Sequence, residues 1–155
     1  MVTNVDEIEL PDFGDGSVLM VGAWRDSLVE RHGYPATDLY CELFWLPRLG
    51  PSALWMLRRL AATAAAHPAP ISVPVTDLSV SLGLSDHIGR NSAVAKTLRR
   101  LVAFDAATYS DQIYQVRLAL GPLPQRHLAK LPPSLQELHS RWPHHRTVTA
   151  ARAAS

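Results

Sequence analysis

The chain of 155 residues is poor in cysteine and in long apolar runs. Cys41 is its only cysteine, so no internal disulfide can form, and this favours a reducing compartment. The longest apolar run, residues 18–24, is far shorter than the roughly 20 residues that span a bilayer. The acidic N-terminus has no basic segment before an apolar run, so it does not resemble a secretory signal. We therefore expect a cytoplasmic protein without a membrane span.

Motifs that bind phosphate or metal, or that activate a nucleophile, are also missing. The sequence has no glycine-rich phosphate loop, no Gly-x-Ser-x-Gly and no paired cysteines. The C-terminal histidines His127, His139, His144 and His145 have spacings that match no standard zinc site. Nothing in the sequence orients Cys41 toward a histidine base. We predict no metal site, no cofactor and no enzymatic activity.

Charge is unevenly distributed, although the formal net charge is only +1. Residues 1–16 contain acidic residues and no basic ones, while all 15 lysines and arginines follow them. This N-terminal arm also lacks periodicity and is broken by proline and glycine, so we predict that it is disordered. It either adds solubility or shields a basic face until nucleic acid displaces it.

The remaining sequence predicts one folded domain, residues 17–142, followed by a disordered tail at 143–155. An apolar fraction of 47% with 19% charged residues is typical of such a domain. Residues 18–21 suit a strand, but the spacing of later apolar residues favours a helix over 17–31. Further helices are predicted at 37–46, 51–66, 125–131 and 134–142, the last with a capping box from Ser134 to Glu137. The β-branched segment 71–73 lies between prolines and predicts an edge strand.

The stretch from Thr76 to Leu118 carries the most informative pattern. Thr76 is predicted to cap a short helix that Gly83 ends, and a second helix is predicted from Asn91 to Phe104. Alternating residues over 106–118 then predict a β-hairpin.

The second of these helices separates apolar from basic residues when it is wound at 3.6 residues per turn. The core face is formed by Val94, Leu98, Leu101 and Val102. The opposite face, which we expect to be exposed, carries Ser92, Lys96, Arg99, Arg100 and Ala103. No acidic residue occurs between Asn91 and Phe104, so this helix carries nothing that repels a phosphate backbone.

Helix, turn, helix and hairpin in this order resemble a winged helix-turn-helix DNA-binding domain of the bacterial transcriptional-regulator type. The resemblance covers about residues 37–120 and rests on Leu78, the sequence 82–84, the basic helix and the hairpin. It implies an α+β fold, mostly α, with a small β-hairpin wing and flanking N- and C-terminal helices. The turn, residues 83–90, is longer than in the simplest helix-turn-helix proteins. A weaker likeness, over residues 42–55, is to winged-helix domains of bacterial primosome and phage replication proteins.

The resemblance implies a homodimeric transcriptional regulator that docks helix 91–104 in the major groove of double-stranded DNA. Residues 90–92 are then expected to meet base edges, Lys96 to reach either bases or phosphate, and Arg99 and Arg100 to contact phosphate. The residues assigned to DNA contact are Arg90, Asn91, Ser92, Lys96, Arg99, Arg100, Gln112 and Arg117. Asp111 at the hairpin turn opposes a deep wing contact. Alternatively, the domain is a protein-interaction or replication-accessory module that does not itself read DNA sequence.

Overall fold

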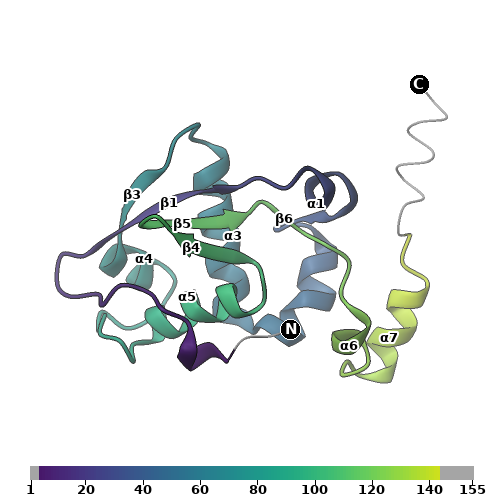
Figure 1. Cartoon of the computed structure of the whole chain (residues 1–155). Helices are drawn as coiled ribbons and strands as arrows, with labels where there is room; N and C mark the ends of the chain where they lie inside the picture. Colours follow the sequence, from purple (N-terminus) through teal and green to yellow (C-terminus); the bar gives the residue numbers. More distant parts are fainter. Residues whose placement is uncertain (1–3, 144–155) are drawn as a thin grey trace.

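The computed structural model describes residues 4–143, which form an α+β fold around a mixed four-stranded sheet (Figure 1). The strand order is β3-β1-β5-β4. Strand β1 (Val18–Trp24) runs antiparallel to β3 (Ile71–Pro74) and parallel to β5 (Ile113–Arg117). Strand β4 (Ala107–Ser110) pairs antiparallel with β5 and closes the predicted hairpin. The predicted edge strand before α4 is confirmed, since β3 lies at one edge of the sheet.

The prediction of a helix over 17–31 is wrong, because the first half of this segment is the central strand β1. Alternate side chains of this strand enter the core: Leu19 and Val21 are buried, while Val18 and Met20 are exposed. The second half is a short helix, α1 (Ser27–His32), capped by Asp26, whose carboxylate accepts hydrogen bonds from the N–H groups of residues 28 and 29. Residues 18–24 form a strand rather than a helix because they pair on both sides with distant segments of the chain.

Helices α3, α4 and α5 lie on one side of the sheet (Figure 1). Other predicted helices are present with shifted ends: the π-helical segment η2 (Cys41–Trp45) runs directly into α2 (Leu46–Leu49), so Pro47 does not end it. The main helical elements are α3 (Pro51–Ala65), α4 (Val75–Ser81), α5 (Ala93–Ala103), α6 (Gln125–Leu128) and α7 (Pro133–Ser140). In residues 4–143 no helix has the length and apolarity needed to cross a membrane.

Helices α4 and α5 end in the same way, with a residue in the left-handed region. Gly83 (φ +75°) follows α4, as predicted, and Asp105 (φ +57°) follows α5. In both, the next N–H groups return to carbonyls of the last turn: Ala106 donates to Leu101, and Leu84 donates to Ser79. This is the Schellman pattern, which ends α5 and turns the chain into β4.

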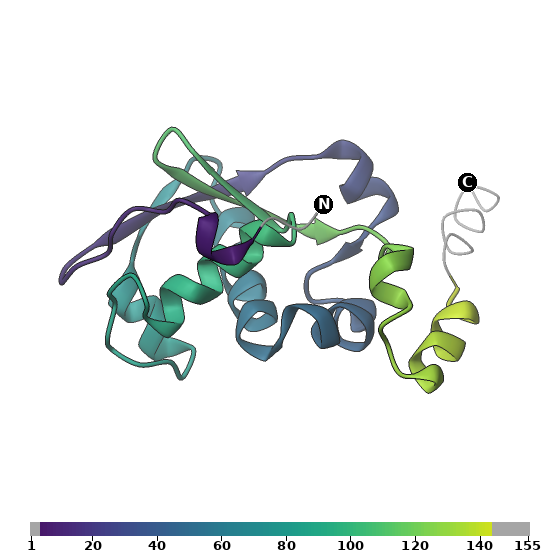
Figure 2. The same cartoon turned by 60° about the horizontal axis from the view of Figure 1, so that its bottom comes forward.

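The N-terminal arm is ordered from residue 4, in contrast to the prediction for residues 1–16. It begins with a 3₁₀ turn, η1 (Val5–Glu7), that contacts α5 (Figure 2). Ile8 and Phe13 are buried, and Phe13 belongs to the main core. These two apolar side chains among the acids hold the arm to the domain, because their burial offsets the entropy lost on ordering.

The C-terminal helices α6 and α7 lie at the end of the molecule far from β3 and α4 (Figure 1). Before them, β6 (Ala119–Leu120) pairs with β2 (Tyr34–Pro35) in a small second sheet. The predicted capping box at Ser134 does not form, since α7 already begins at Pro133 and has no side-chain cap. Of the predicted tail only Pro143 falls within the described residues.

The hairpin turn gives a test of this backbone. Asp111 and Gln112 both have positive φ, +52° and +62°. Residues other than glycine and asparagine rarely adopt this backbone conformation. Replacing Gln112→Gly should therefore raise the free energy of unfolding by about 1 kcal/mol, measured by urea denaturation. Gln115→Gly, inside β5, should instead destabilise the protein. A similar effect of both changes would contradict the described turn.

Candidate nucleic-acid interface

Helix α5 is the element on which the predicted interface depends. Ser92 caps it, accepting a hydrogen bond from the N–H of Ala95 at 3.2 Å. The predicted core face is largely correct: Val94, Leu98 and Leu101 are fully buried. The hydroxyl of Tyr114 on β5 donates to the carbonyl of Leu98 at 2.7 Å. The hairpin and α5 are thereby joined inside the core.

The prediction that the opposite face is exposed is wrong for three of its five residues. Ser92, Arg99 and Ala103 are buried, with 2%, 6% and 4% of their surface exposed. Arg99 donates from Nη2 to the carbonyl of Arg90 at 2.7 Å, and its buried Nε has no partner among the described residues. The helical wheel placed Arg99 on the outer side of α5, but it could not show what covers that side.

Arg100 is held within the domain by main-chain carbonyls. Its Nε donates to Leu49 at 2.5 Å and its Nη2 to Arg48 at 2.8 Å. The guanidinium also lies 5.0 Å from the centre of the Phe104 ring. These contacts fix α5 to the junction of α2 and α3, so Arg100 has a structural role that the sequence did not indicate.

Arg117, expected to be free at the hairpin, is also engaged. Its Nε donates to the carbonyl of Asp105 at 2.6 Å, and its Nη1 pairs with the carboxylate of Asp26 at 3.1 Å. The guanidinium stacks 3.7 Å from the centre of the Trp24 ring. The N–H of Val29 first and then Arg117 lower the pKa of Asp26. This network links β1, α1 and β5, and it leaves Arg117 unsuited to a wing contact.

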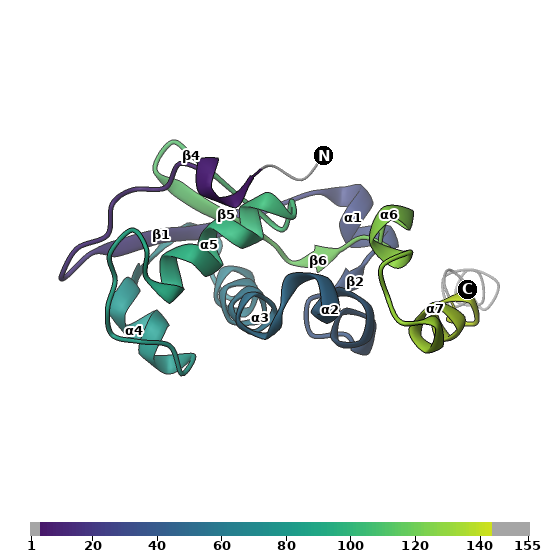
Figure 3. The same ribbon diagram turned by 90° about the horizontal axis from the view of Figure 1, so that it is seen from below.

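Four of the eight predicted contact residues are exposed: Arg90, Asn91, Lys96 and Gln112. Arg90 and Asn91 precede α5, Lys96 lies on its second turn, and Gln112 lies at the hairpin turn. The acidic arm passes over α5 (Figure 3), and Val5 and Asp6 line a hollow with Lys96. The described ion pairs include none of the arm's acids. The arm therefore lowers the field around α5 without neutralising a particular base.

Further basic residues, which the sequence analysis missed, surround the C-terminal end of α5. The centre of this group is His127, only 4% exposed, whose Nδ1 accepts a hydrogen bond from Arg48 Nε at 3.3 Å. Arg126 and Lys130 are exposed beside it. None of these bases forms an ion pair with a described acid. We call Arg48, Arg126 and Lys130 the basic patch.

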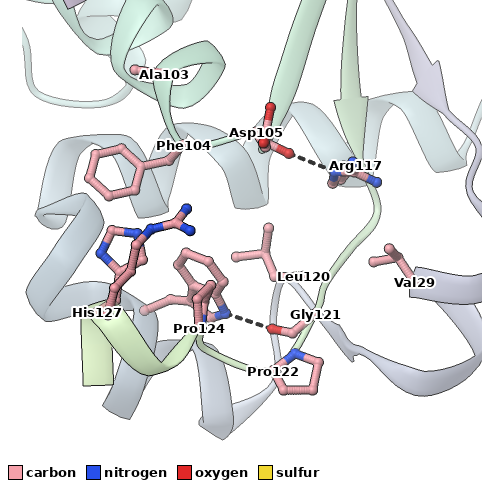
Figure 4. A pocket seen from close by; sticks show the side chains of 12 residues that line it. Val29, Ala103, Phe104, Asp105, Arg117, Leu120, Gly121, Pro122, Pro124 and His127 are labelled. Carbon is pink, nitrogen blue, oxygen red and sulfur yellow. Dashed lines mark hydrogen bonds between the residues drawn. The ribbon is translucent and has the colours of Figure 1, made fainter. Parts of the chain in front are cut away.

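A pocket of about 180 Å³ lies between α5 and α6 (Figure 4). Trp45, Phe104 and Leu120 form apolar walls, and His127 and Arg126 line it as well. The indole N–H of Trp45 donates to the carbonyl of Gly121 at 2.9 Å and fixes this wall. Arg117 and Asp105 lie together on one side of the pocket, opposite His127 (Figure 4).

The single cysteine and the described histidines do not come together in a metal site. Cys41 is buried, its thiol donates to the carbonyl of Pro35 at 3.3 Å, and burial raises its pKa to about 12. His139 contacts the hydroxyl of Tyr40 at 2.8 Å. Within residues 4–143 no group of three or more His, Cys, Asp or Glu side chains has the arrangement of a metal site. His144 and His145 lie outside these residues.

Comparisons of the chain with known protein families, with curated proteins and with solved structures found no match.

The different roles of Arg100 and Lys96 can be tested by stability. Arg100→Ala should lower the free energy of unfolding by about 2 kcal/mol, because two carbonyls lose a charged donor. Lys96→Ala, one helical turn earlier and exposed, should change it by less than about 0.5 kcal/mol. Urea denaturation measures both. Equally small changes in the free energy of unfolding for both variants would indicate that Arg100 is a free surface base, as expected from the sequence.

The environment of His127 predicts a pH dependence. Burial, followed by the charges of Arg126, Arg48 and Lys130, lowers the pKa of His127 below 6.5. The unfolded state then binds more protons, so the stability contributed by neutral His127 is lost as the pH falls below about 6.5. An NMR titration of its ring protons should give this lowered pKa, and His127→Gln should weaken the acid-induced loss of stability. A measured pKa of 6.5 or above would contradict this account.

Proposed function

We propose that the domain binds double-stranded DNA, as a transcriptional regulator of winged-helix type, through α5 and the adjoining basic patch. The observation that carries the proposal is the distribution of unpaired bases. Ion pairs in the described residues engage arginines 25, 58, 117 and 141, whereas the bases on α5 and around its C-terminal end have no carboxylate partner. Such a concentration of unneutralised charge attracts a phosphate backbone.

In this proposal the bases have two roles. Arg90 and Lys96, which are exposed, contact DNA directly, and Asn91 lies at the N-terminal end of α5, where helices of this type meet base edges. The basic patch contributes affinity without sequence choice. Arg99 and Arg100 hold α5 in place rather than contacting phosphate.

The acidic arm limits how DNA can approach. Because η1 contacts α5 and the arm passes over its outer side, deep docking of α5 in a major groove requires the arm to move. Its acids also repel phosphate within a Debye length, about 8–10 Å at physiological salt. The arm is therefore proposed to weaken DNA binding until DNA displaces it.

The alternative is a protein-interaction or replication-accessory module, and one observation favours it. Val18 and Met20 are 53% and 36% exposed on the outer face of β1, in the middle of the sheet rather than at its rim. Apolar residues exposed there are typical of a surface that meets another protein. Under this alternative, the covered α5 does not read DNA.

Fluorescence anisotropy with a labelled duplex, at several salt concentrations, tests the proposal. Affinity should fall with salt, and Arg90→Ala with Lys96→Ala should reduce the slope of log K against log salt by about 2. Arg59→Ala, an exposed base on α3, is the matched control and should change little.

The same assay tests the arm. Replacing its acids with amides (Asp6→Asn, Glu7→Gln, Glu9→Gln, Asp12→Asn and Asp15→Asn) keeps Ile8 and Phe13 and should increase affinity for DNA. An affinity that does not change with salt concentration would contradict the DNA-binding proposal and leave the protein-interaction alternative. Salt-dependent binding with the same affinity in the amide variant as in the wild-type chain would contradict only the proposed role of the arm.

A further inference from the structure

The pocket between α5 and α6 has walls from well-separated parts of the chain. Val29 comes from α1, Trp45 from η2, Phe104 from the end of α5, Leu120 from β6 and His127 from α6. Its volume is about 180 Å³, and a cavity of about 150 Å³ in another protein holds benzene. The pocket therefore has room for one ring-sized group between aromatic and aliphatic side chains.

The His127 side of this pocket is positively charged and has free donors. Arg126 lines the pocket, and no described residue forms an ion pair or a hydrogen bond with its side chain. Because Nδ1 of His127 accepts from Arg48, the proton of the neutral ring is on Nε2. No described residue accepts from that Nε2–H. Lys130 adds a further positive charge near the ring.

The opposite side of the pocket is already neutralised. Arg117 there is paired with Asp26 and bonded to the carbonyl of Asp105, and the carboxylate of Asp105 would repel an anion. A negative group is therefore favoured only at the His127 side (Figure 4).

We infer that this pocket binds a small organic acid with a flat apolar body, such as an aromatic carboxylate. The ring lies between Trp45, Phe104 and Leu120, and the carboxylate accepts hydrogen bonds from Arg126 and from His127 Nε2–H. Arg126 holds the acid as a guanidinium–carboxylate pair. The depressed pKa of His127 keeps its ring neutral, with the Nε2 proton available. This binding does not depend on the proposed DNA contact and is measured without DNA.

Sodium benzoate is the probe for the full chain, followed by NMR of the His127 ring protons and the Trp45 indole N–H. Both signals should shift and saturate. Arg126→Gln should weaken binding about tenfold, as expected for one lost charged hydrogen bond. Arg31→Gln removes the same charge from an exposed position on α1 that does not line the pocket, and it should leave binding unchanged.

Two further measurements separate charge from shape. Benzamide, the neutral analogue, should bind about tenfold more weakly than benzoate. Gly121→Leu adds a side chain at the pocket lining, where a Cβ meets no atom within 4 Å, and it should abolish the saturable shifts of both signals.

Three outcomes would overturn the inference: no saturable shift at either residue, equal affinity for benzamide, or equal loss in the Arg31→Gln and Arg126→Gln variants. Failure of benzoate binding would leave the salt-dependent DNA assay unaffected, so the two proposals fail separately.

Discussion

Helix α5 is contacted from three directions, and the arrangement of the domain depends on this. On its inner side Leu98 packs in the core and receives a hydrogen bond from Tyr114 of the hairpin. Toward α2 and α3, Arg100 donates to two carbonyls, and η1 of the arm contacts the helix from a third side. A helix held from so many sides is positioned rigidly, but only a few of its side chains can reach a partner. Rigidity and accessibility therefore compete at this helix.

The sequence predicted the local features and missed those that depend on distant segments. Gly83, the apolar stripe of α5 and the alternation of the hairpin were sufficient to locate α4, α5, β4 and β5, because each signal lies within the element that it specifies. Strand β1 was mistaken for a helix, since its partners are residues 71–74 and 114–117. No window of sequence around Val21 contains that pairing. The α+β class was correct, but the central position of the N-terminal strand was not foreseen.

The site was predicted less well than the fold, for an electrostatic reason. Arginine has five donors and a long apolar stem, so the same side chain can face solvent or satisfy main-chain carbonyls. Arg90 and Lys96 remained exposed, whereas Arg99, Arg100 and Arg117 found partners within the domain. Those partners, such as the carbonyl of Leu49, carry no signature in the sequence. The basic patch around His127 was missed because its members come from α2 and the region of α6.

The position of β1 has a consequence for how the chain is made. This strand leaves the ribosome before both of its neighbours in the sheet, β3 and β5, which follow it by about 50 and 90 residues. Until those residues emerge, the segment that contains Leu19 and Val21 has no strand to pair with, and both of its edges have unpaired backbone groups. Such a segment favours binding by a chaperone during synthesis and slow, late closure of the sheet. The central strand of this domain is therefore synthesised before either of the strands that pair with it.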